Sequence, residues 1–306
     1  MNYPAQQADM NDSVFIHVNH KQWLGAVVGK YALEKNSAHN DKFDVQFIEV
    51  KDQPFMAARE GDYYLRDGDK RQWLNNDLQS FTPLRFMPPE LMGYTGRALV
   101  IDPDVFAVGD VWELLSRDMQ GNALMCRPKS GNKGKRGALA SSVMLLDCAQ
   151  LPHWKVEQQF NEMFTGGRDY MKWIGLYLED RSTIGLFENE WNDFDHLTPA
   201  TKMLHTTKRR HQPWKTGLKV DYRITDTFRL FPPRHWLRRA RRAVFGDYGL
   251  AGHYKPHPDP AQERLFFTLV SECLDLGIIT ESVIRDEMAH NHVRHDAIEL
   301  VKKLAA

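Results

Sequence analysis

Residues 97–110 read RALVIDPDVFAVGD, an apolar run, a break at Asp-Pro-Asp and a second apolar run that ends at a glycine. A short continuous apolar run between breakers is typical of a buried parallel strand. Asp102 and Asp104 then lie at the carboxyl end of that strand, where open α/β sheets bind their ligands. Because Pro103 favours an extended backbone at the residue before it, side chains two positions apart should point the same way.

Two carboxylates that converge are hard oxygen donors of the kind that Mg²⁺ or Mn²⁺ binds together with substrate phosphates. The pair Asp102 and Asp104 therefore predicts a metal site. The alternative is a surface turn with two solvated acids, the ordinary role of an isolated Asp-x-Asp. The remaining evidence must come from elsewhere in the chain.

The composition excludes several classes of protein. Of the 306 residues, 40 are lysine or arginine and 40 are aspartate or glutamate, so no overall charge points to a nucleic-acid partner. The three cysteines, Cys126, Cys148 and Cys273, form neither a disulfide framework nor a zinc pattern, and we expect free buried thiols. No apolar segment reaches about 18 residues and the N-terminus is polar, so we expect a cytoplasmic protein without a membrane span or signal peptide.

Basic residues are nevertheless concentrated in two segments. Residues 202–242 hold thirteen lysines and arginines and two acids, and residues 127–136 hold five and no acid. Both segments are candidate contacts for anions. The stretch from Arg234 to Arg242 interleaves basic and apolar side chains, which suits peripheral contact with an anionic membrane or an acidic acceptor. A solvated helix face is the simpler alternative.

The order of the elements predicts an α/β fold. Strands at 13–18 and 43–50 with a helix at 21–33 between them form a β-α-β opening, which implies a right-handed crossover and a parallel sheet. Further strands are expected at 123–127, 141–147 and 203–207, and helices at 82–92, 111–115 and 154–170. Residues 62–76 are left unassigned.

The end of the chain predicts helices only. Asp259 and Pro260 suit the N-cap and first position of a helix whose apolar face ends before Gly277. A helical pair at 281–290 and 294–304 follows. We therefore expect a disordered leader over residues 1–12, an α/β domain over 13–220 and a helical C-terminal extension over 221–306.

Three segments carry a resemblance to a known family. Residues 82–86, TPLRF, precede LVIDPDVFAVGDVWEL at 99–114, and MLHTTKRRHQPWK follows at 203–215. In order, spacing and residue type they resemble the family 8 glycosyltransferases, which have an arginine segment before a "vlYLDaDvlv.gdl.eL" motif and a later "iiHf.g..KPW" motif. The resemblance covers about residues 13–217. It implies the GT-A fold, a Rossmann-like, mixed, mostly parallel sheet flanked by helices.

The resemblance implies a set of metal and donor contacts. Asp102 and Asp104 would hold a divalent metal against the donor diphosphate, and Arg85 would contact the donor. His205 falls on the metal-binding histidine of the family, and an imidazole ligand favours Mn²⁺ over Mg²⁺. A histidine with a purely structural role is the alternative.

One strand motif of the family is altered in this chain, and another segment is matched. The "FN(A/S)GVmlin" strand matches LASSVMLLD at 139–147, in which Ala140 replaces the asparagine and Ser142 replaces the glycine. We expect the hydroxyls of Ser141 and Ser142 to supply the donor contact instead. A "lp..wN" segment is matched by LFENEWN at 186–192, to which we assign no role.

The basic turn departs from the family as well. Gln212 stands where a lysine usually contacts the diphosphate. Lys208, Arg209 or Lys215 is expected to replace it. The basic side chains of such a turn can neutralise a leaving diphosphate, and a solvated loop is the alternative.

These residues predict a metal-dependent glycosyltransferase. It would move a sugar from a nucleotide-diphosphate sugar, a uridine diphosphate sugar being the first choice, to a glycan or lipid-linked acceptor, with retention as the resemblance implies. His17 and Val18, at the end of the first strand, are expected beside the nucleoside. No carboxylate is assigned as nucleophile or base, so the catalytic residues stay unknown.

Two other functions remain open. One is a non-catalytic nucleotide-sugar or glycan-binding protein on the same fold, which the changes at Ala140 and Gln212 favour. The other is a nucleotidyltransferase, which would need a glycine-rich phosphate loop near the first strand, and the sequence has none there.

Overall fold

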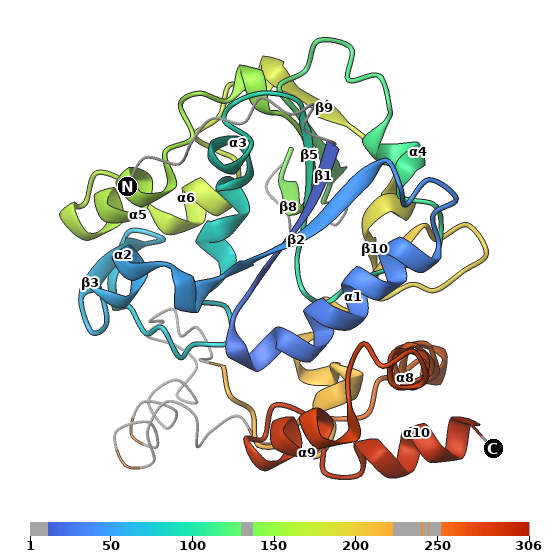
Figure 1. Ribbon diagram of the computed structural model, residues 1–306. Coiled ribbons are helices and arrows are strands. Elements are labelled where there is room, and N and C mark those ends of the chain that lie inside the picture. Colours follow the sequence, from blue (N-terminus) through green and yellow to red (C-terminus); the bar gives the residue numbers. More distant parts are fainter. Residues whose placement is uncertain (1–11, 130–136, 223–239, 241–243, 245–251, 306) are drawn as a thin grey trace. The chain divides into compact units, whose positions relative to one another are not determined.

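The computed structural model describes residues 12–129, 137–222, 240, 244 and 252–305 (Figure 1). The predicted leader and the predicted membrane contact through residues 234–242 therefore lie almost entirely outside the described residues. Asp12, which was assigned to the leader, already belongs to the first strand.

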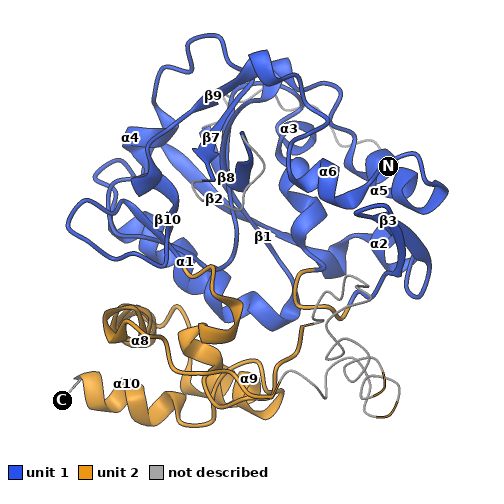
Figure 2. Ribbon diagram, turned by 180° about the vertical axis from the view of Figure 1, so that it is seen from behind, with its two compact units in different colours: residues 1–75, 80–205 blue, residues 76–79, 206–306 orange. Residues whose placement is uncertain are grey.

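The chain divides into two compact units (Figure 2). Unit 1 comprises residues 1–75 and 80–205, and unit 2 comprises residues 76–79 and 206–306. The unit boundary at 205/206 lies before the domain boundary expected at 220/221, so the basic turn at 208–215 groups with the C-terminal helices.

Unit 1 is built on a six-stranded sheet of order β2-β1-β5-β8-β7-β9. Its strands are β1 (Asp12–Val18), β2 (Phe43–Glu49), β5 (Arg97–Ile101), β7 (Leu124–Pro128), β8 (Leu139–Asp147) and β9 (Ile184–Leu186). Within this sheet β1 pairs in parallel with β2 and β5, and β9 pairs in parallel with β7. β8 runs antiparallel to β5 and β7. The predicted mixed, mostly parallel sheet is confirmed.

Helices cover both faces of this sheet. In Figures 1 and 2, α1 (Trp23–Lys35) and α4 (Trp112–Leu115) lie on one side, and α3 (Pro88–Leu91), α5 (Val156–Thr165) and α6 (Tyr170–Ile174) on the other. This explains why β1, β5 and β8 are buried over nearly their whole length, on both faces. The apolar runs of the sequence are therefore the centre of the sheet.

Two prolines shorten one of the predicted helices, and a glycine shortens another. Residues 82–92 form a 3₁₀ helix, η3 (Thr82–Phe86), and the short α3, since Pro88 and Pro89 lack the N–H groups that a continuous helix needs. α5 ends at Gly166, whose φ of 83° is the left-handed conformation of a helix C-terminus. The helix expected over 154–170 is thus α5 alone, and α6 begins separately.

The unassigned residues 62–76 contain a hairpin. β3 (Tyr63–Arg66) pairs antiparallel with β4 (Asp69–Gln72) across Asp67 and Gly68, which have φ of 55° and 79°. Positive φ at both central residues is the geometry of a tight two-residue hairpin turn. Trp73, the residue after β4, meets the ring of Phe160 of α5 edge-on with centroids 4.9 Å apart, which anchors the hairpin to the unit.

A second, three-stranded sheet of order β10-β11-β6 completes unit 1. It contains β6 (Val105–Ala107), β10 (Asp193–Phe194) and β11 (Met203–His205). β11 runs antiparallel to β6 and parallel to β10. Because β6 follows β5 after the Asp-Pro-Asp turn, this sheet brings the 203–205 strand beside that turn.

Short helical turns connect these elements. They are α2 (Pro54–Ala57) and the 3₁₀ helices η1 (His20–Gln22), η2 (Val50–Asp52), η4 (Cys148–Gln150), η5 (Arg181–Thr183) and η6 (Asn189–Asn192). Cys126, Cys148 and Cys273 are free and buried, as the sequence predicts, and burial raises the pKa of Cys126 and Cys148 to about 12.

Unit 2 contains α8 (Pro260–Asp275), α9 (Glu281–Ala289) and α10 (Ala297–Ala305), preceded by η7 (Arg209–His211) and η8 (Pro213–Lys215). Asp259 accepts a hydrogen bond from the backbone N–H of Ala261 at 2.9 Å, so the predicted N-cap is confirmed. Trp214 stacks on Phe266 of α8 with ring centroids 4.7 Å apart. The predicted C-terminal helices are confirmed.

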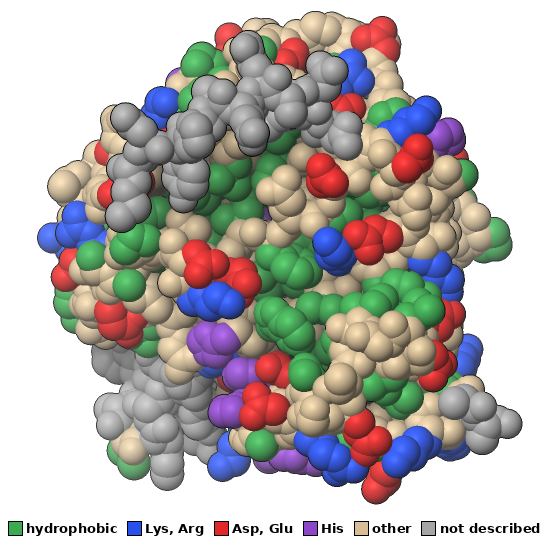
Figure 3. Space-filling view, viewed as in Figure 1, with side chains coloured by type: hydrophobic (Ala, Val, Ile, Leu, Met, Phe, Trp, Pro, Cys, Tyr) green, Lys and Arg blue, Asp and Glu red, His purple; other side chains and the backbone are tan. Residues whose placement is uncertain are grey.

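Two properties concern the surface of the described residues. None of their helices has the length and apolar character needed to cross a membrane. On the face shown in Figure 3, basic and acidic side chains are interspersed, in keeping with their equal totals in the sequence.

Candidate metal centre

The Asp-Pro-Asp segment forms a turn between β5 and β6. The backbone N–H of Val105 donates to the carbonyl of Asp102 at 3.2 Å, which closes a four-residue turn with Pro103 at its second position. The extended backbone expected across this segment is therefore wrong. The chain reverses direction at Pro103, and the turn, not the period of a strand, brings the two carboxylates together.

His205 joins this pair from another part of the sequence. It lies at the end of β11, opposite Val105 of β6. One oxygen each of Asp102 and Asp104 and one ring nitrogen of His205 all lie within 4.8 Å of one another. The structure therefore brings together the three residues that were predicted as metal ligands.

Two nitrogen-bearing side chains lie against Asp102. Arg85 Nη2 donates to its two oxygens at 2.8 and 3.1 Å, and His17 Nε2 lies 2.8 Å from Oδ1. Burial raises the pKa of Asp102, but Arg85 and His17 more than offset this and hold it at about 2. Asp102 is therefore ionised at neutral pH.

The pKa values of the two histidines shift in opposite directions. Burial lowers the pKa of His17, although Asp102 opposes the shift. Burial also lowers the pKa of His205, but the charges of Asp104 and Asp102 more than offset it, so that the pKa is raised. His205 Nε2 lies 3.3 Å from Asp104 Oδ1 and its Nδ1 lies 2.8 Å from Asn192 Oδ1.

The two serines predicted to contact the donor have protein partners. Ser141 Oγ donates to the carbonyl of Ile174 at 2.5 Å and accepts from Arg85 Nη1 at 2.6 Å. Ser142 Oγ accepts from Asn192 Nδ2 at 3.0 Å. Each hydroxyl thus supports a residue of the centre, and contact with a donor stays a prediction. Asn192, matched to a motif without a role, is the residue that sequence reasoning missed.

The first strand ends at this centre. His17 and Val18 are completely buried, and the next residue, Asn19, donates from Nδ2 to Ser80 Oγ at 2.9 Å. His17 reaches the centre through Asp102. The predicted position of His17 and Val18 beside a nucleoside stays a prediction.

Lys208 and Lys215 belong to unit 2. Lys208 is exposed, whereas the Lys215 side chain is completely buried and donates to Asp221 Oδ2 at 2.9 Å. Tyr254 donates from its hydroxyl to the other oxygen of Asp221, and burial raises the pKa of this tyrosine. The Lys215 ammonium is therefore paired with Asp221 inside unit 2. Its contact with a diphosphate stays a prediction, and so does that of Lys208.

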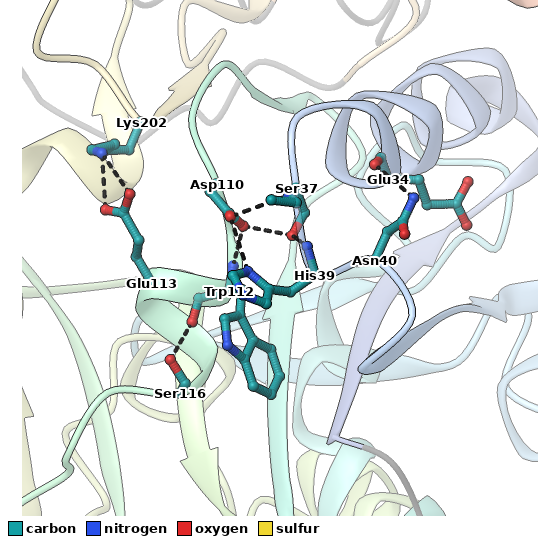
Figure 4. A network of polar contacts seen from close by, with 10 residues as sticks. Glu34, Ser37, His39, Asn40, Asp110, Trp112, Glu113, Ser116 and Lys202 are labelled. Atoms are coloured by element: carbon teal, nitrogen blue, oxygen red, sulfur yellow. Dashed lines mark hydrogen bonds and ion pairs between the residues drawn. The ribbon is translucent and has the colours of Figure 1, made fainter.

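A third carboxylate near β6 has a structural role. At the opposite end of β6 from Asp104, Asp110 Oδ1 accepts from Ser37 Oγ at 2.5 Å and from the N–H of Trp112 at 2.9 Å (Figure 4). In the same view Lys202 donates to Glu113 at 2.9 Å. These contacts join the end of α1 to the start of α4. The Asp110 carboxylate is thus occupied by hydrogen bonds between these segments.

The donor set of the centre fits a divalent cation. Two carboxylates and an imidazole converge within 4.8 Å, and their oxygen atoms and ring nitrogen repel one another unless a proton or a cation lies between them. Two oxygen ligands and one nitrogen ligand suit Mn²⁺ better than Mg²⁺. Asp102 and Asp104 are half-buried, so an ion could reach them.

No protein-family model matches this chain, and no curated protein matches it significantly. Among solved structures, the chain is similar to the galactosyltransferase LgtC in complex with donor and acceptor sugar analogues, at 14% identity over 66% of this chain and 89% of that chain, with a TM-score of 0.46. It is similar to the glycosyltransferase GlyE of Streptococcus pneumoniae, apo form, at 13% identity over 88% of this chain and 64% of that chain, with a TM-score of 0.48.

A third similar structure is mouse xyloside xylosyltransferase 1, apo form, at 13% identity over 65% of this chain and 98% of that chain, with a TM-score of 0.41. These three solved structures are glycosyltransferases.

Proposed function

We propose that this protein is a metal-dependent glycosyltransferase that uses a nucleotide-diphosphate sugar, with uridine diphosphate as the nucleotide. The observation that carries the proposal is the convergence of Asp102, Asp104 and His205 at the carboxyl end of β5. A centre of this kind, at this edge of an α/β sheet, suits a ligand that brings phosphate groups.

Asp102, Asp104 and His205 would hold Mn²⁺ or Mg²⁺. The ion, when bound, would neutralise the charge of the diphosphate as the nucleotide leaves. Arg85 offsets the charge of one of the two carboxylates, so the centre carries one net negative charge once His205 has lost its proton, as a metal ligand must. A divalent cation would therefore leave the centre positive toward a diphosphate.

Arg85 orients Asp102. Its Nη2 donates to both oxygens of that carboxylate while its Nη1 donates to Ser141 Oγ, and the residue is 7% exposed. A guanidinium fixed at two ends holds the carboxylate in one rotamer. Arg85 thus contributes by preorganising the centre.

The finer features of the proposal come from the sequence. His17 and Val18 would lie beside the nucleoside, and Arg85, Ser141, Ser142, Lys208 and Lys215 would contact the donor. The sugar would pass with retention to a glycan or lipid-linked acceptor, in the cytoplasm, with residues 234–242 as a contact for an anionic membrane.

A second candidate is a nucleotide-sugar or glycan-binding protein without catalysis. It is favoured by the replacement of the family asparagine by Ala140 and by the internal hydrogen bonds of the two serine hydroxyls that follow it. Such a protein would bind a donor at the same metal centre and leave it intact.

The experiment is a calorimetric titration of uridine diphosphate with Mn²⁺ and again with a chelator, on wild type, Asp104→Ala and a control. Asp44→Ala is the control because it removes an exposed carboxylate on β2. We expect binding that requires Mn²⁺ in wild type and control, weakened at least about tenfold in Asp104→Ala.

Binding of no nucleoside diphosphate by wild type, with or without Mn²⁺, would overturn the proposal. Where binding is found, incubation of wild type with uridine diphosphate sugars and Mn²⁺ separates the two candidates. An enzyme slowly hydrolyses one of the donors and loses this with Asp104→Ala, whereas a binding protein releases every donor unchanged.

A further inference from the structure

We propose that Asn192 is a positioning residue, which fixes His205 in the tautomer that directs the lone pair of Nε2 at Asp104, and that Ser142 and Arg127 hold Asn192 for this purpose. The inference rests on the proposed function, since it concerns a ligand of the same metal centre. It assigns a role to a residue that the sequence left without one.

The side chain of Asn192 has a defined orientation. Asn192 ends η6 and is completely buried. Its Nδ2 donates to Ser142 Oγ at 3.0 Å, which leaves Oδ1 facing His205 Nδ1 at 2.8 Å. An amide oxygen can only accept, so Nδ1 of His205 must carry the hydrogen. In the neutral ring Nε2 then carries the lone pair.

This tautomer turns two side chains into a cation site. The lone pair of His205 Nε2 faces Asp104 Oδ1 at 3.3 Å, and both atoms are acceptors. Two acceptors at this distance repel each other unless a proton or a metal lies between them. In the opposite tautomer Nε2 would donate to Asp104 and occupy the oxygen that a metal needs. Asn192 therefore determines whether His205 Nε2 and Asp104 Oδ1 bind a cation together or form a hydrogen bond with each other.

Arg127 contacts the two residues that pack against the His205 imidazole, Asn192 and Phe194. Its Nη1 donates to the backbone carbonyl of Asn192 at 2.5 Å, and its guanidinium lies 4.0 Å from the ring centroid of Phe194. Phe194 in turn meets the His205 ring edge-on, with centroids 5.4 Å apart. The register of β7 shifts between Cys126 and Arg127, and such bulges redirect side chains next to functional sites.

Ser142 connects the imidazole to the carboxylates. Its hydroxyl accepts from Asn192, and its backbone carbonyl accepts from the N–H of Asp102 at 2.9 Å. One residue of β8 therefore supports ligands on both sides of the centre. Substitution by alanine removes only the hydroxyl, so Ser142→Ala tests the imidazole side while the Asp102 contact stays.

The first measurement is nitrogen-15 NMR of the histidine rings in metal-free protein at alkaline pH, where the rings are neutral. We expect His205 of wild type to be protonated at Nδ1, and Asn192→Leu to move the hydrogen partly or wholly to Nε2. Asn192→Asp keeps an acceptor opposite Nδ1 and should restore the wild-type tautomer. A hydrogen on Nε2 in wild type, or no change in Asn192→Leu, would overturn the inference.

The second measurement compares Mn²⁺ with Mg²⁺ by calorimetry. An imidazole contributes more to Mn²⁺ than to Mg²⁺, so Asn192→Leu should weaken Mn²⁺ binding by about 10- to 100-fold and Mg²⁺ binding much less. Asn192→Asp should keep most of the Mn²⁺ affinity. Equal losses for the two ions would show a general structural defect and overturn the positioning role.

Ser142→Ala is the second variant should Asn192→Leu not fold. It should shift the Mn²⁺ preference in the same direction by a smaller factor, and an unchanged preference would count against the inference. Failure of the proposed function is separable, because the NMR measurement needs neither metal nor nucleotide. Wild type that binds no metal but shows the Nδ1 tautomer refutes the proposed function and leaves the tautomer assignment intact.

Discussion

The Ser141 hydroxyl allows a test of how Arg85 is held at the metal centre. Ser141 Oγ is bonded to the carbonyl of Ile174 and to Arg85, and the residue is 4% exposed. Ser141→Ala leaves both partners unsatisfied in the interior, which should lower the free energy of unfolding by about 1–3 kcal/mol in urea titrations. Ser116→Ala is the matched control, since Ser116 donates to a backbone carbonyl at the surface and should change stability by less than about 0.5 kcal/mol (Figure 4). If the two variants lowered the free energy of unfolding by the same small amount, the Ser141 hydroxyl would not be needed for stability and would be available to contact a sugar donor.

The residues of the centre could be predicted from the sequence better than their arrangement. Asp102, Asp104 and His205 were found from motifs, and the structure brings them together. The reason given for the convergence of the carboxylates was wrong, because a turn that depends on one hydrogen bond replaced an extended backbone. The role of Asn192 could not be found, since hydrogen bonds across separate strands leave no pattern in the sequence.

Lys215 allows a direct test of a sequence prediction. Its buried ammonium pairs with Asp221, so Lys215→Met leaves a carboxylate with less compensation and should lower the free energy of unfolding by about 2 kcal/mol or more. Lys208→Met, at an exposed lysine, should leave stability nearly unchanged. Urea titration measures both. A Lys215→Met variant of wild-type stability with weakened binding of uridine diphosphate would instead favour the diphosphate contact.

At the scale of elements, α1 positions the metal turn by close packing. A Cβ on Gly25 would lie 2.6 Å from the carbonyl oxygen of Pro103, which is shorter than any allowed contact and involves backbone. Gly25→Ala should therefore displace the turn, destabilise the protein by about 1–3 kcal/mol and weaken Mn²⁺ binding. Gly29→Ala, one turn further along, meets the carbonyl of Val105 at 3.2 Å and should have a smaller effect. Urea titration and Mn²⁺ calorimetry measure both variants. A larger loss of stability and of Mn²⁺ affinity in Gly29→Ala than in Gly25→Ala would contradict this packing.

Some elements could be predicted because their signals are local. The β-α-β opening and the start of α8 at Pro260 follow from runs and caps within a few residues. The β3–β4 hairpin was missed because its strands are short and largely exposed, so they show no apolar alternation. The β10-β11-β6 sheet pairs segments about 100 residues apart, and single-sequence patterns do not record such pairing.

Asp169 links the hairpin to α6 and gives a prediction for pH. It accepts from the backbone N–H groups of Met171, Lys172 and Gly68 at 2.8, 3.2 and 2.9 Å. Burial raises the pKa of Asp169, but these hydrogen bonds more than offset it and lower the pKa. Its stabilising effect is thus complete above the unfolded pKa of about 3.9 and is lost as the pH falls through the lower folded pKa.

Asp169→Asn should therefore be less stable than wild type by about 1 kcal/mol at neutral pH, because one of the two acceptor oxygens becomes an NH₂ group that cannot accept a hydrogen bond, and the carboxylate charge is lost. The difference should shrink below about pH 4, where the wild-type carboxylate becomes protonated. Urea titrations from neutral to acid pH measure it. Asp44→Asn, at an exposed carboxylate on β2, should show no such trend, and a constant difference for Asp169→Asn would exclude the carboxylate charge as its cause.

At the scale of the whole molecule, the chain divides into two units of different kind. Unit 1 holds the sheet and the metal centre, and unit 2 holds helices and the basic turn. The sequence predicted both kinds of structure. It placed the boundary by a change in composition near residue 221, whereas the compact units separate at residue 206, where the chain leaves β11.

The centre should therefore couple the stability of the molecule to metal. An ion that binds the folded protein and not the unfolded chain stabilises it by about 2.7 kcal/mol at a concentration 100 times its Kd. For unfolding units of about 150–250 residues this raises Tm by several degrees. We expect Mn²⁺ to raise the Tm of wild type in scanning calorimetry, a chelator to reverse it, and Asp104→Ala to abolish it. Asp110→Ala should lower Tm by loss of the hydrogen bonds from Ser37 and Trp112 yet keep the Mn²⁺ response, because Asp110 lies at the other end of β6. An equal Mn²⁺ response in wild type and Asp104→Ala would place the ion outside this centre.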